Sequence, residues 1–288
     1  MKIDANSVTF EPQDMAFVKK FGILKATEMA LDYHAEHPNL PFLYDAEQLA
    51  GFLGISRGEL NDIVNHIQKE YKEAHLPKKD GTYRSLCVPS IRLRFCQDPI
   101  KEKILPQLPV SKFATAYQKG STTRGNAEPH IGKKFLLKLD ITDFFGSITF
   151  EQVQRTAFNT RYVSRQVGYL LTSLCCKNDS LPQGAATSPA LSNIVMYRFD
   201  DYIGRWCSQR KIAYTRYCDD MTFSADRPLY GVYQKVKTML REMGFELNEL
   251  KTHFIGNDNR QNVTGLVVNE KLSIPSSYKR NLRQEIYY

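Results

Sequence analysis

Several patterns that define other classes of protein are missing from this sequence. No C-x-x-C pair occurs among the six cysteines, and no pair of histidines stands near them at zinc-finger spacing, so a structural zinc site is not expected. The N-terminus has no apolar signal-peptide core, and nowhere do 18 apolar residues follow one another, so we expect neither a signal peptide nor a membrane span. Internal repeats and low-complexity tracts are also absent.

What is present is typical of a globular protein with an excess of positive charge. The 288 residues are 42% hydrophobic and 24% charged, enough for one large domain or two small ones. The cysteines are typical of buried apolar residues in a cytoplasmic protein. Lys and Arg number 39 against 31 Asp and Glu, a net charge of +8. Such an excess favours a polyanionic partner such as nucleic acid, although a merely basic surface explains it equally well.

The hydrophobic pattern predicts a mixture of helices and hairpins. Helices are expected over residues 14–33, 45–71 with a break near Gly54, 90–105 interrupted at Pro99, 150–176, 188–206 and 232–243. Hairpins are expected over 76–90 with a turn at Asp80–Gly81, over 212–225, and over 262–275 with a turn at Asn269–Glu270. A further strand is expected around Asp140. The helices near Gly54 form either a DNA-reading helix–turn–helix or, more simply, a helical hairpin.

Three aspartates occupy positions that need explaining. Asp140 lies within the apolar run "FLLKLDITDFF", where an unpaired buried charge is very costly. Either a salt bridge or a metal ion compensates it. Asp219 and Asp220, in "YCDDM", are likewise carboxylates flanked by apolar residues. If that turn lies beside the Asp140 strand, three carboxylates converge, and hard oxygen ligands favour Mg²⁺. Two such ions suit a phosphoryl transfer.

Residues suited to a nucleotide occur elsewhere in the chain. Lys78, Lys79 and Arg84 on the first hairpin could neutralise a triphosphate. In "LPQGAATSPALSN", Gln183 and Gly184 precede a helix, where a small-residue backbone lets a ligand approach closely. Phe145 could form an apolar wall beside a nucleotide, although by itself it would be read as an ordinary core aromatic.

Five segments of the sequence, in the order in which they occur, resemble motifs of the reverse-transcriptase family. They are "LDITDFF", "LPQGAATSPALSN", "YCDD", "GFELNELKT" and "VTGLVVN", and the match runs from about residue 77 to 275. Two further segments resemble the retron branch of that family. "NAEPH", from Asn126 to His130, fits an N-A-x-x-H signature, and Val263, Thr264 and Gly265 fit a V-T-G triplet.

The resemblance implies a role for each matching residue. Asp140, Asp219 and Asp220 would be catalytic and would bind two Mg²⁺ ions, for which Mn²⁺ can substitute, with help from the Ile141 carbonyl. The nucleotide site would comprise Lys78, Lys79, Arg84, Asp143, Phe144, Phe145, Gln183, Gly184 and Lys251. Within it, Phe145 would exclude a ribose 2′-OH and Lys251 would lie near the leaving pyrophosphate. RNA or primer contacts would come from Asn126, His130, Val263, Thr264 and Gly265, with positioning of the loop as the alternative role of Asn126 and His130.

The resemblance also implies the fold. We expect an α+β, right-hand polymerase fold with a palm and fingers. Residues 1–75 would form a helical N-terminal extension, 76–139 fingers and the linking loop, 140–254 the palm with interleaved fingers helices, and 255–288 the primer-grip hairpin and the start of a thumb. Most of the thumb is missing, because the sequence is truncated or because the thumb is very short.

The implied function is RNA-directed DNA synthesis by a retron enzyme. A structured noncoding RNA would serve as template and primer, and the other partners would be dNTPs, an RNA–DNA duplex and an effector protein in defence against phage, with no membrane. Two alternatives remain at this point. One is a group II intron-type or diversity-generating reverse transcriptase; the other is a helix–turn–helix DNA-binding regulator, which leaves the carboxylates unexplained.

Overall fold

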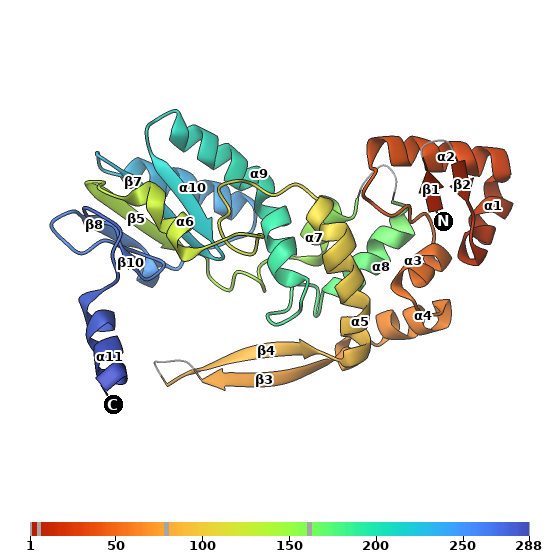
Figure 1. Cartoon of the computed structure of the whole chain (residues 1–288), viewed down its shortest axis with the longest axis horizontal. Helices are drawn as coiled ribbons and strands as arrows, with labels where there is room; N and C mark the ends of the chain where they lie inside the picture. The colour runs from red at the N-terminus through yellow and green to blue at the C-terminus, as the bar shows by residue number, and fades with distance from the viewer. Residues whose placement is uncertain (1, 5–6, 78–80, 160–162, 288) are drawn as a thin grey trace. The chain divides into compact units, whose positions relative to one another are not determined.

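The structure is a computed structural model, and it describes residues 2–4, 7–77, 81–159 and 163–287 (Figure 1). It divides into two compact units, Met1–Pro109 with Ile148–Val195 and Val110–Ser147 with Met196–Tyr288. Helix α9 (Ser188–Ser208) supplies residues to both. Each unit is thus built from separate stretches of chain. The four consecutive sections expected from the sequence stay a prediction.

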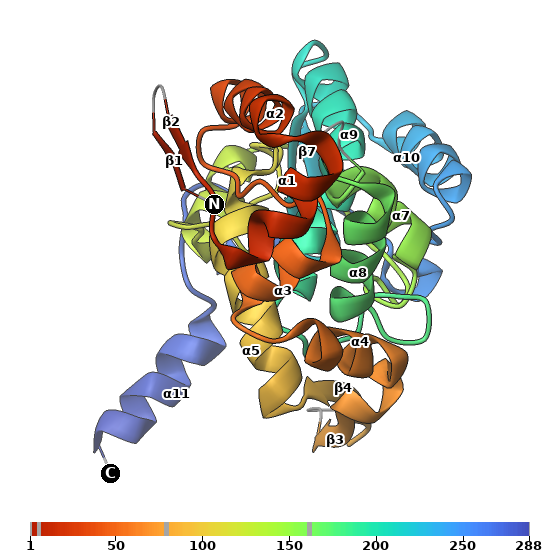
Figure 2. The same ribbon diagram turned by 90° about the vertical axis from the view of Figure 1, so that its right-hand side faces the viewer.

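The first unit is mainly helical. Its helices are α1 (Met15–Phe21), α2 (Ile23–Glu36), α3 (Ala46–Leu53), α4 (Arg57–Asn65), α5 (Ile91–Pro99), α7 (Phe150–Ala157) and α8 (Arg165–Cys175). Its strands form two antiparallel hairpins, β1 (Lys2–Asp4) with β2 (Ser7–Thr9) and β3 (Tyr71–Pro77) with β4 (Tyr83–Pro89). Helices α3, α4, α5 and α8 pack on one another (Figure 2). The first of the two hairpins was not predicted.

The break between α3 and α4 has the predicted local cause. Gly54 ends α3 in the left-handed conformation, with φ 73°, which costs glycine little. Ser56 then caps α4, because its hydroxyl accepts from the Glu59 amide at 3.2 Å. The prediction of helix up to Tyr71 was wrong. Tyr71 already begins β3, where it is buried and its hydroxyl accepts from Gln97 at 3.0 Å.

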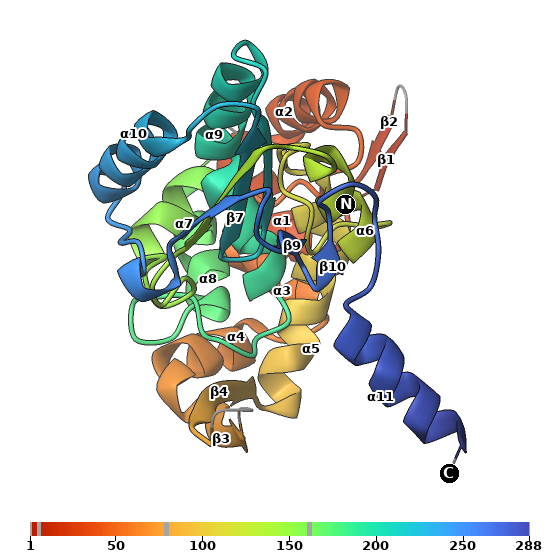
Figure 3. The same cartoon turned by 90° about the vertical axis from the view of Figure 1, so that its left-hand side faces the viewer.

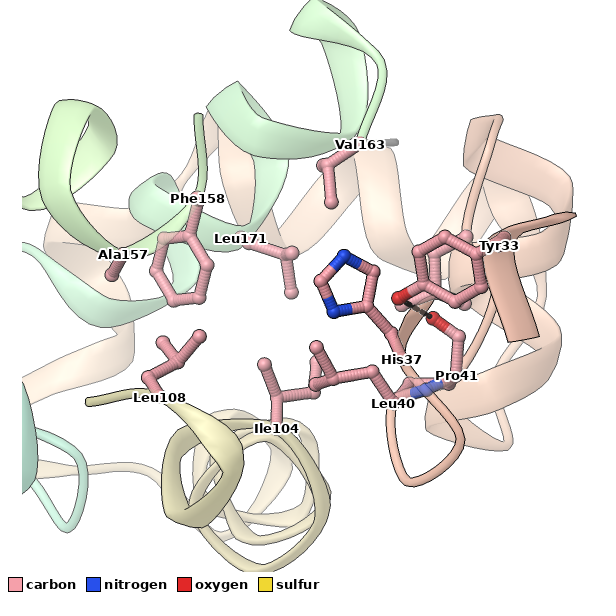
Figure 4. Close-up of a pocket in the computed structure, with 11 residues that line it drawn as sticks. Tyr33, His37, Leu40, Pro41, Ile104, Leu108, Ala157, Phe158, Val163 and Leu171 are labelled. Atoms are coloured by element: carbon pink, nitrogen blue, oxygen red, sulfur yellow. Dashed lines mark hydrogen bonds between the residues drawn. The ribbon is translucent and has the colours of Figure 1, made fainter. Parts of the chain in front are cut away.

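The first unit also contains a small apolar pocket, shown in Figure 4. The ring of His37 points among apolar side chains that include Ile104, Phe158 and Leu171 (Figure 4). At its edge, the Tyr33 hydroxyl donates to the Pro41 carbonyl at 3.0 Å. No carboxylate is among the described residues that line it, so this pocket is not the acidic centre that the sequence predicts.

The second unit is built on a four-stranded antiparallel sheet in the order β6-β7-β5-β8. Its elements are α6 (Thr123–Ala127), β5 (Phe135–Asp140), β6 (Ala213–Tyr217), β7 (Asp220–Ala225), α10 (Tyr230–Glu242), β8 (His253–Gly256), β9 (Asn262–Val263), β10 (Leu266–Val267) and α11 (Ser276–Tyr287). Leu136, Leu137 and Leu139 of β5 are all buried, so both faces of this central strand are covered. With helices and sheets in both units, the α+β class is confirmed.

The strand register places the acidic residues at one end of the sheet. Asp140 is the last residue of β5 and lies opposite Asp220, the first residue of β7. Tyr217 ends β6 and also pairs with Asp220. Cys218, in the tight turn between them, has φ 60°. The predicted strand–turn–strand is therefore confirmed, and it lies directly beside the strand that carries Asp140.

The hairpin near the C-terminus turns earlier than predicted. Strands β9 and β10 pair across Thr264 and Gly265, which have φ 45° and 83°. The chain returns once more, but only through a single bridge between Val267 and Ser273. The predicted turn at Asn269–Glu270 therefore closes that bridge and not the paired strands.

Helix α11 follows this hairpin and extends away from it (Figures 1 and 3). Across the described part of the chain, no helix combines the length and the apolar composition needed to cross a membrane.

Candidate active site

The three aspartates meet at the end of the β6-β7-β5-β8 sheet. Asp140 and Asp220 face each other across the β5–β7 ladder, and the Ile141 amide donates to the Asp219 carbonyl at 3.2 Å. The backbone carbonyl of Asp140 accepts from the Asn248 amide at 2.8 Å. The residues around Asp140 are thereby fixed on both sides. The predicted position of the acidic turn beside the Asp140 strand is confirmed, whereas the convergence of all three carboxylates on one metal site stays a prediction.

The carboxyl groups of Asp219 and Asp220 have raised pKa values. Burial raises the pKa of Asp219, and the neighbouring charge of Asp220 raises it further. Burial also raises the pKa of Asp220, and the charge of Asp140 acts in the same direction. Both groups therefore lie where a nearby cation would lower the electrostatic cost of their charge.

Lys251 supplies one such cation from within the chain. Its ammonium donates to both carboxylate oxygens of Asp140, at 2.9 and 3.1 Å. The Asp140 side chain is only 8% exposed, whereas that of Lys251 is 60% exposed. The hydrogen bond to Asp140 is the main cause of a raised pKa of Lys251, so this lysine is charged at neutral pH. The salt bridge that the sequence analysis offered to explain the buried charge of Asp140 is therefore present. Because Asp219 and Asp220 lie beside it, the other explanation, a metal ion, also stays open.

The donor chemistry of this centre fits a divalent ion. Carboxylates and a backbone carbonyl are the ligands that Mg²⁺ prefers, and the repulsion that raises the pKa of Asp219 is what a cation would relieve. Among the described residues, however, no group of three or more His, Cys, Asp or Glu side chains is gathered closely enough to bind a metal as it stands. Metal binding by these residues therefore stays a prediction.

The two aromatic residues that follow Asp140, Phe144 and Phe145, lie in different environments. Phe145 is partly exposed, and its ring centroid lies 6.5 Å from that of Tyr117. Phe144 is only 5% exposed and packs against Phe245 and the guanidinium of Arg216. The ring of Phe144 therefore belongs to the core, and contact of this residue with the nucleotide stays a prediction. Asp143 is exposed, with φ 42°.

The other predicted nucleotide-binding residues belong to the first unit. Arg84 is exposed on β4, and the Gln183 carbonyl accepts from the Cys87 amide of the same strand at 2.7 Å. Gly184, at φ 118°, lies so close that a Cβ would come within 2.9 Å of the Cys87 carbonyl oxygen. The Gln183 loop is thus fixed to the strand that carries Arg84. Lys78 and Lys79 lie outside the described residues.

The residues predicted to contact RNA are mostly buried. Asn126 is 1% exposed, and His130 and Val263 are 0% exposed. These three side chains are therefore not available for direct contact with RNA, which leaves the loop-positioning role for Asn126 and His130, whereas Thr264 is partly exposed and Gly265 is exposed. RNA or primer binding at this place stays a prediction. The ring nitrogens of His130 lie 2.7 Å from the Ser224 hydroxyl and 2.9 Å from the Thr215 hydroxyl.

The buried His130 should make the stability of the protein depend on pH. Burial lowers the pKa of His130 to about 3. Below the ordinary pKa of about 6.5, the histidine is therefore protonated in the unfolded chain but stays neutral in the folded protein. Its contribution to stability is therefore lost as the pH falls. Between pH 8 and pH 5 we expect the free energy of unfolding to fall by about 2 kcal/mol from this group alone. Urea titrations across that range should give a smaller fall for His130→Gln; equal slopes would contradict the prediction.

A buried ion pair behind the acidic turn was missed by the sequence analysis. Arg216 and Asp200 are both fully buried, and their side chains meet at 2.6 Å between Nη2 and Oδ2. Nη1 of Arg216 also donates to the Cys218 carbonyl at 2.8 Å, and the Tyr214 hydroxyl donates to Asp200 at 2.7 Å. The arginine thus links helix α9 to the turn that carries Asp219. An Arg in the middle of a buried strand was the only available signal.

Comparison with known proteins identifies the family. A family model described as reverse transcriptase (RNA-dependent DNA polymerase) matches residues 76–268. The chain belongs to this family. As a reverse transcriptase, it is an RNA-directed DNA polymerase, and the acidic turn and its partner strand lie within the matched residues. Members of the family generally use divalent metal ions, which agrees with the donor chemistry of the three aspartates.

Curated relatives place this reverse transcriptase in the retron branch. It is 34% identical over 233 residues to the retron Ec83 reverse transcriptase of Escherichia coli, covering 75% of each chain. It is 29% identical over 270 residues to the retron Ec86 reverse transcriptase of Escherichia coli, covering 92% of this chain and 84% of the relative. To the retron Mx65 reverse transcriptase of Myxococcus xanthus it is 32% identical over 272 residues, covering 86% and 64%. The predicted retron type is confirmed.

A solved structure confirms the polymerase fold. The telomerase from Candida albicans, solved in complex with a TWJ fragment of telomeric RNA, is similar with a TM-score of 0.51 at 13% identity. The similarity covers 73% of this chain and 48% of that chain, so this protein spans about half the length of the telomerase. At this identity the comparison bears on the fold alone. The alternative that the chain is a helix–turn–helix DNA-binding regulator is therefore no longer needed to explain the sequence.

Proposed function

We propose that this retron reverse transcriptase copies a structured noncoding RNA, as both template and primer, into branched multicopy single-stranded DNA. The observation that carries the chemistry is the meeting of Asp140, Asp219 and Asp220 at one end of a buried sheet. The primer would be an internal guanosine 2′-OH, as the resemblance to retrons implies. The reaction is transfer of dNMP from a dNTP to this hydroxyl.

The residues of the acidic centre have separate roles in this proposal. Asp140, Asp219, Asp220 and the Ile141 carbonyl would hold two Mg²⁺ ions, or Mn²⁺ in their place, which when bound stabilise the attacking and leaving oxygens. Lys251 has an exposed ammonium beside Asp140, from where it can neutralise or protonate the leaving pyrophosphate. Phe145 and Tyr117 form an aromatic wall, and Phe145 would exclude a ribose 2′-OH.

The incoming nucleotide would be held by residues of the first unit. Arg84 would bind the triphosphate together with Lys78 or Lys79, and Gln183 and Gly184 would line the base and template. The attachment of the Gln183 carbonyl to β4 supports this assignment, because one strand then positions both the guanidinium and the glycine loop. The thumb, the RNA–DNA duplex it would grip and an effector protein in phage defence follow from the retron family, as does a cytoplasmic location.

The proposed product can be detected directly. The chain is expressed together with the DNA that flanks its gene, which should encode an RNA with inverted repeats, and nucleic acid that copurifies with the protein is isolated. We expect a short DNA whose gel mobility changes after RNase and changes again after debranching enzyme. The matched control is the Asp219→Asn and Asp220→Asn double variant, which should yield the RNA without DNA.

Two results would contradict the proposal in different ways. DNA that is insensitive to debranching enzyme would mean that priming starts from an ordinary end and not from a 2′-OH. Abundant branched DNA from the double variant would mean that Asp219 and Asp220 do not carry the chemistry.

A further inference from the structure

The residues that match the N-A-x-x-H signature point inward. Asn126 belongs to α6 and His130 ends the short helical turn that follows it. His130 links two strands, because one ring nitrogen lies 2.9 Å from the Thr215 hydroxyl of β6 and the other 2.7 Å from the Ser224 hydroxyl of β7. A neutral imidazole satisfies both, donating to one hydroxyl and accepting from the other. The histidine thus holds the hairpin that carries Asp219 and Asp220.

Asn126 joins this arrangement to the V-T-G triplet. Its side-chain carbonyl accepts from the Thr115 hydroxyl at 2.6 Å, and its side-chain amide donates to the Thr264 hydroxyl at 3.2 Å. The Thr264 hydroxyl in turn donates to the Thr123 carbonyl of α6 at 3.2 Å. The Thr215 hydroxyl donates to the Asn126 carbonyl at 3.4 Å, which connects the two halves of the network. Two signatures 138 residues apart therefore form one hydrogen-bonded unit.

The turn that this unit holds is conformationally demanding. Thr264 has φ 45°, which is rare for a β-branched residue and persists only when its surroundings fix it. Val263 anchors the turn from one side, fully buried against Ala127 and Leu136. Gly265 is exposed at its tip. The three residues of the triplet thus differ in role. Val263 packs in the core, the side chain of Thr264 is held by hydrogen bonds, and Gly265 is exposed at the end of the turn.

We propose that Asn126, His130 and Thr264 are positioning residues that fix the Thr264–Gly265 turn, and the primer strand it contacts, relative to the β6–β7 hairpin of the active site. This inference rests on the proposed function, in which the turn contacts the primer. The three side chains act through the turn, at which Thr264 is partly exposed and Gly265 is exposed. The nucleotide itself is bound by other residues.

The role of the Thr264 hydroxyl can be isolated with near-isosteric variants. Thr264→Val keeps the β-branch and removes both hydrogen bonds, whereas Thr264→Ser keeps the hydroxyl. Using poly(rA)/oligo(dT) and dTTP, we expect Thr264→Val to raise the KM for the primer–template at least about fivefold, since each lost hydrogen bond has a typical net effect of about that size, without changing the KM for dTTP. Thr264→Ser should retain the wild-type KM for the primer–template. Thr264→Ala, without the β-branch, serves as a second variant and should behave as Thr264→Val does.

A double-variant cycle tests the link to Asn126. If the hydrogen bond between the two side chains carries the effect, Asn126→Ala combined with Thr264→Val should raise the KM for the primer–template no more than the larger of the single changes. Multiplicative effects, an unchanged KM in Thr264→Val, or an equal rise in the KM for dTTP would each overturn the inference. A wild-type chain that incorporates no dTTP would instead overturn the proposed function, so the two failures are distinguishable.

Discussion

Replacing Asp219 by Asn is expected to lower dTTP incorporation on poly(rA)/oligo(dT) by a factor of about 10³ or more while making the protein harder to unfold. The loss follows from removing a proposed metal ligand and a negative charge from the acidic centre, where several kcal/mol of transition-state stabilisation would originate. The gain follows from the pKa of Asp219, which burial and Asp220 raise. A raised pKa means that the ionised carboxylate opposes folding at neutral pH, a penalty relieved only as the pH falls through that pKa. The neutral amide avoids it, so the melting temperature should rise.

Asp226→Asn is the matched control for this experiment. Asp226 follows β7 directly and is exposed, and its carboxylate lies 3.5 Å from the Lys133 ammonium. The same chemical change there should leave incorporation near the wild-type rate and alter stability little. Single-turnover incorporation and thermal unfolding are measured on all three proteins in the same buffer. An active Asp219→Asn variant, or one with a lower melting temperature than wild type, would contradict the argument.

The acidic centre could be predicted because its signal is local. A carboxylate inside an apolar run is anomalous wherever the run folds, and the pairing of "YCDD" with that run requires only adjacent strands. The break at Gly54 was also predictable, because a left-handed glycine and a capping serine act within a few residues. In each case the physical cause lies in the same short stretch of sequence as its effect.

What the sequence did not reveal concerns residues whose environment is set from a distance. The match to a signature does not show that Asn126 and His130 are buried, because their partners Thr264 and Ser224 are 138 and 94 residues away. Phe144 and Phe145 are neighbours in "DFF", and it is the tertiary contacts of Phe144 with Phe245 and Arg216 that place its ring in the core. The turn at Thr264–Gly265 was missed because threonine rarely adopts a positive φ without tertiary contacts, which the sequence does not reveal.

The Arg216–Asp200 pair should be the most sensitive structural element behind the active site. Both side chains are fully buried, so Asp200→Ala leaves the guanidinium without its charge partner in the core. We expect the free energy of unfolding to fall by about 3–5 kcal/mol, as for other broken buried pairs. Urea denaturation measures the loss. Asp201→Ala is the matched control, because the adjacent Asp201 pairs with the exposed Arg205 on the surface, where such a pair contributes about 0–1 kcal/mol.

A double replacement separates the charge pair from the shape of the turn. Asp200→Leu with Arg216→Met removes both charges and fills the space with apolar atoms, which should recover most of the stability that Asp200→Ala loses. Methionine cannot donate to the Cys218 carbonyl, however, and that hydrogen bond holds the residue before Asp219 at φ 60°. The double variant should therefore fold but incorporate dTTP at least tenfold more slowly than the wild type. Full activity would mean that the strands alone shape the turn, and that the buried arginine serves stability only.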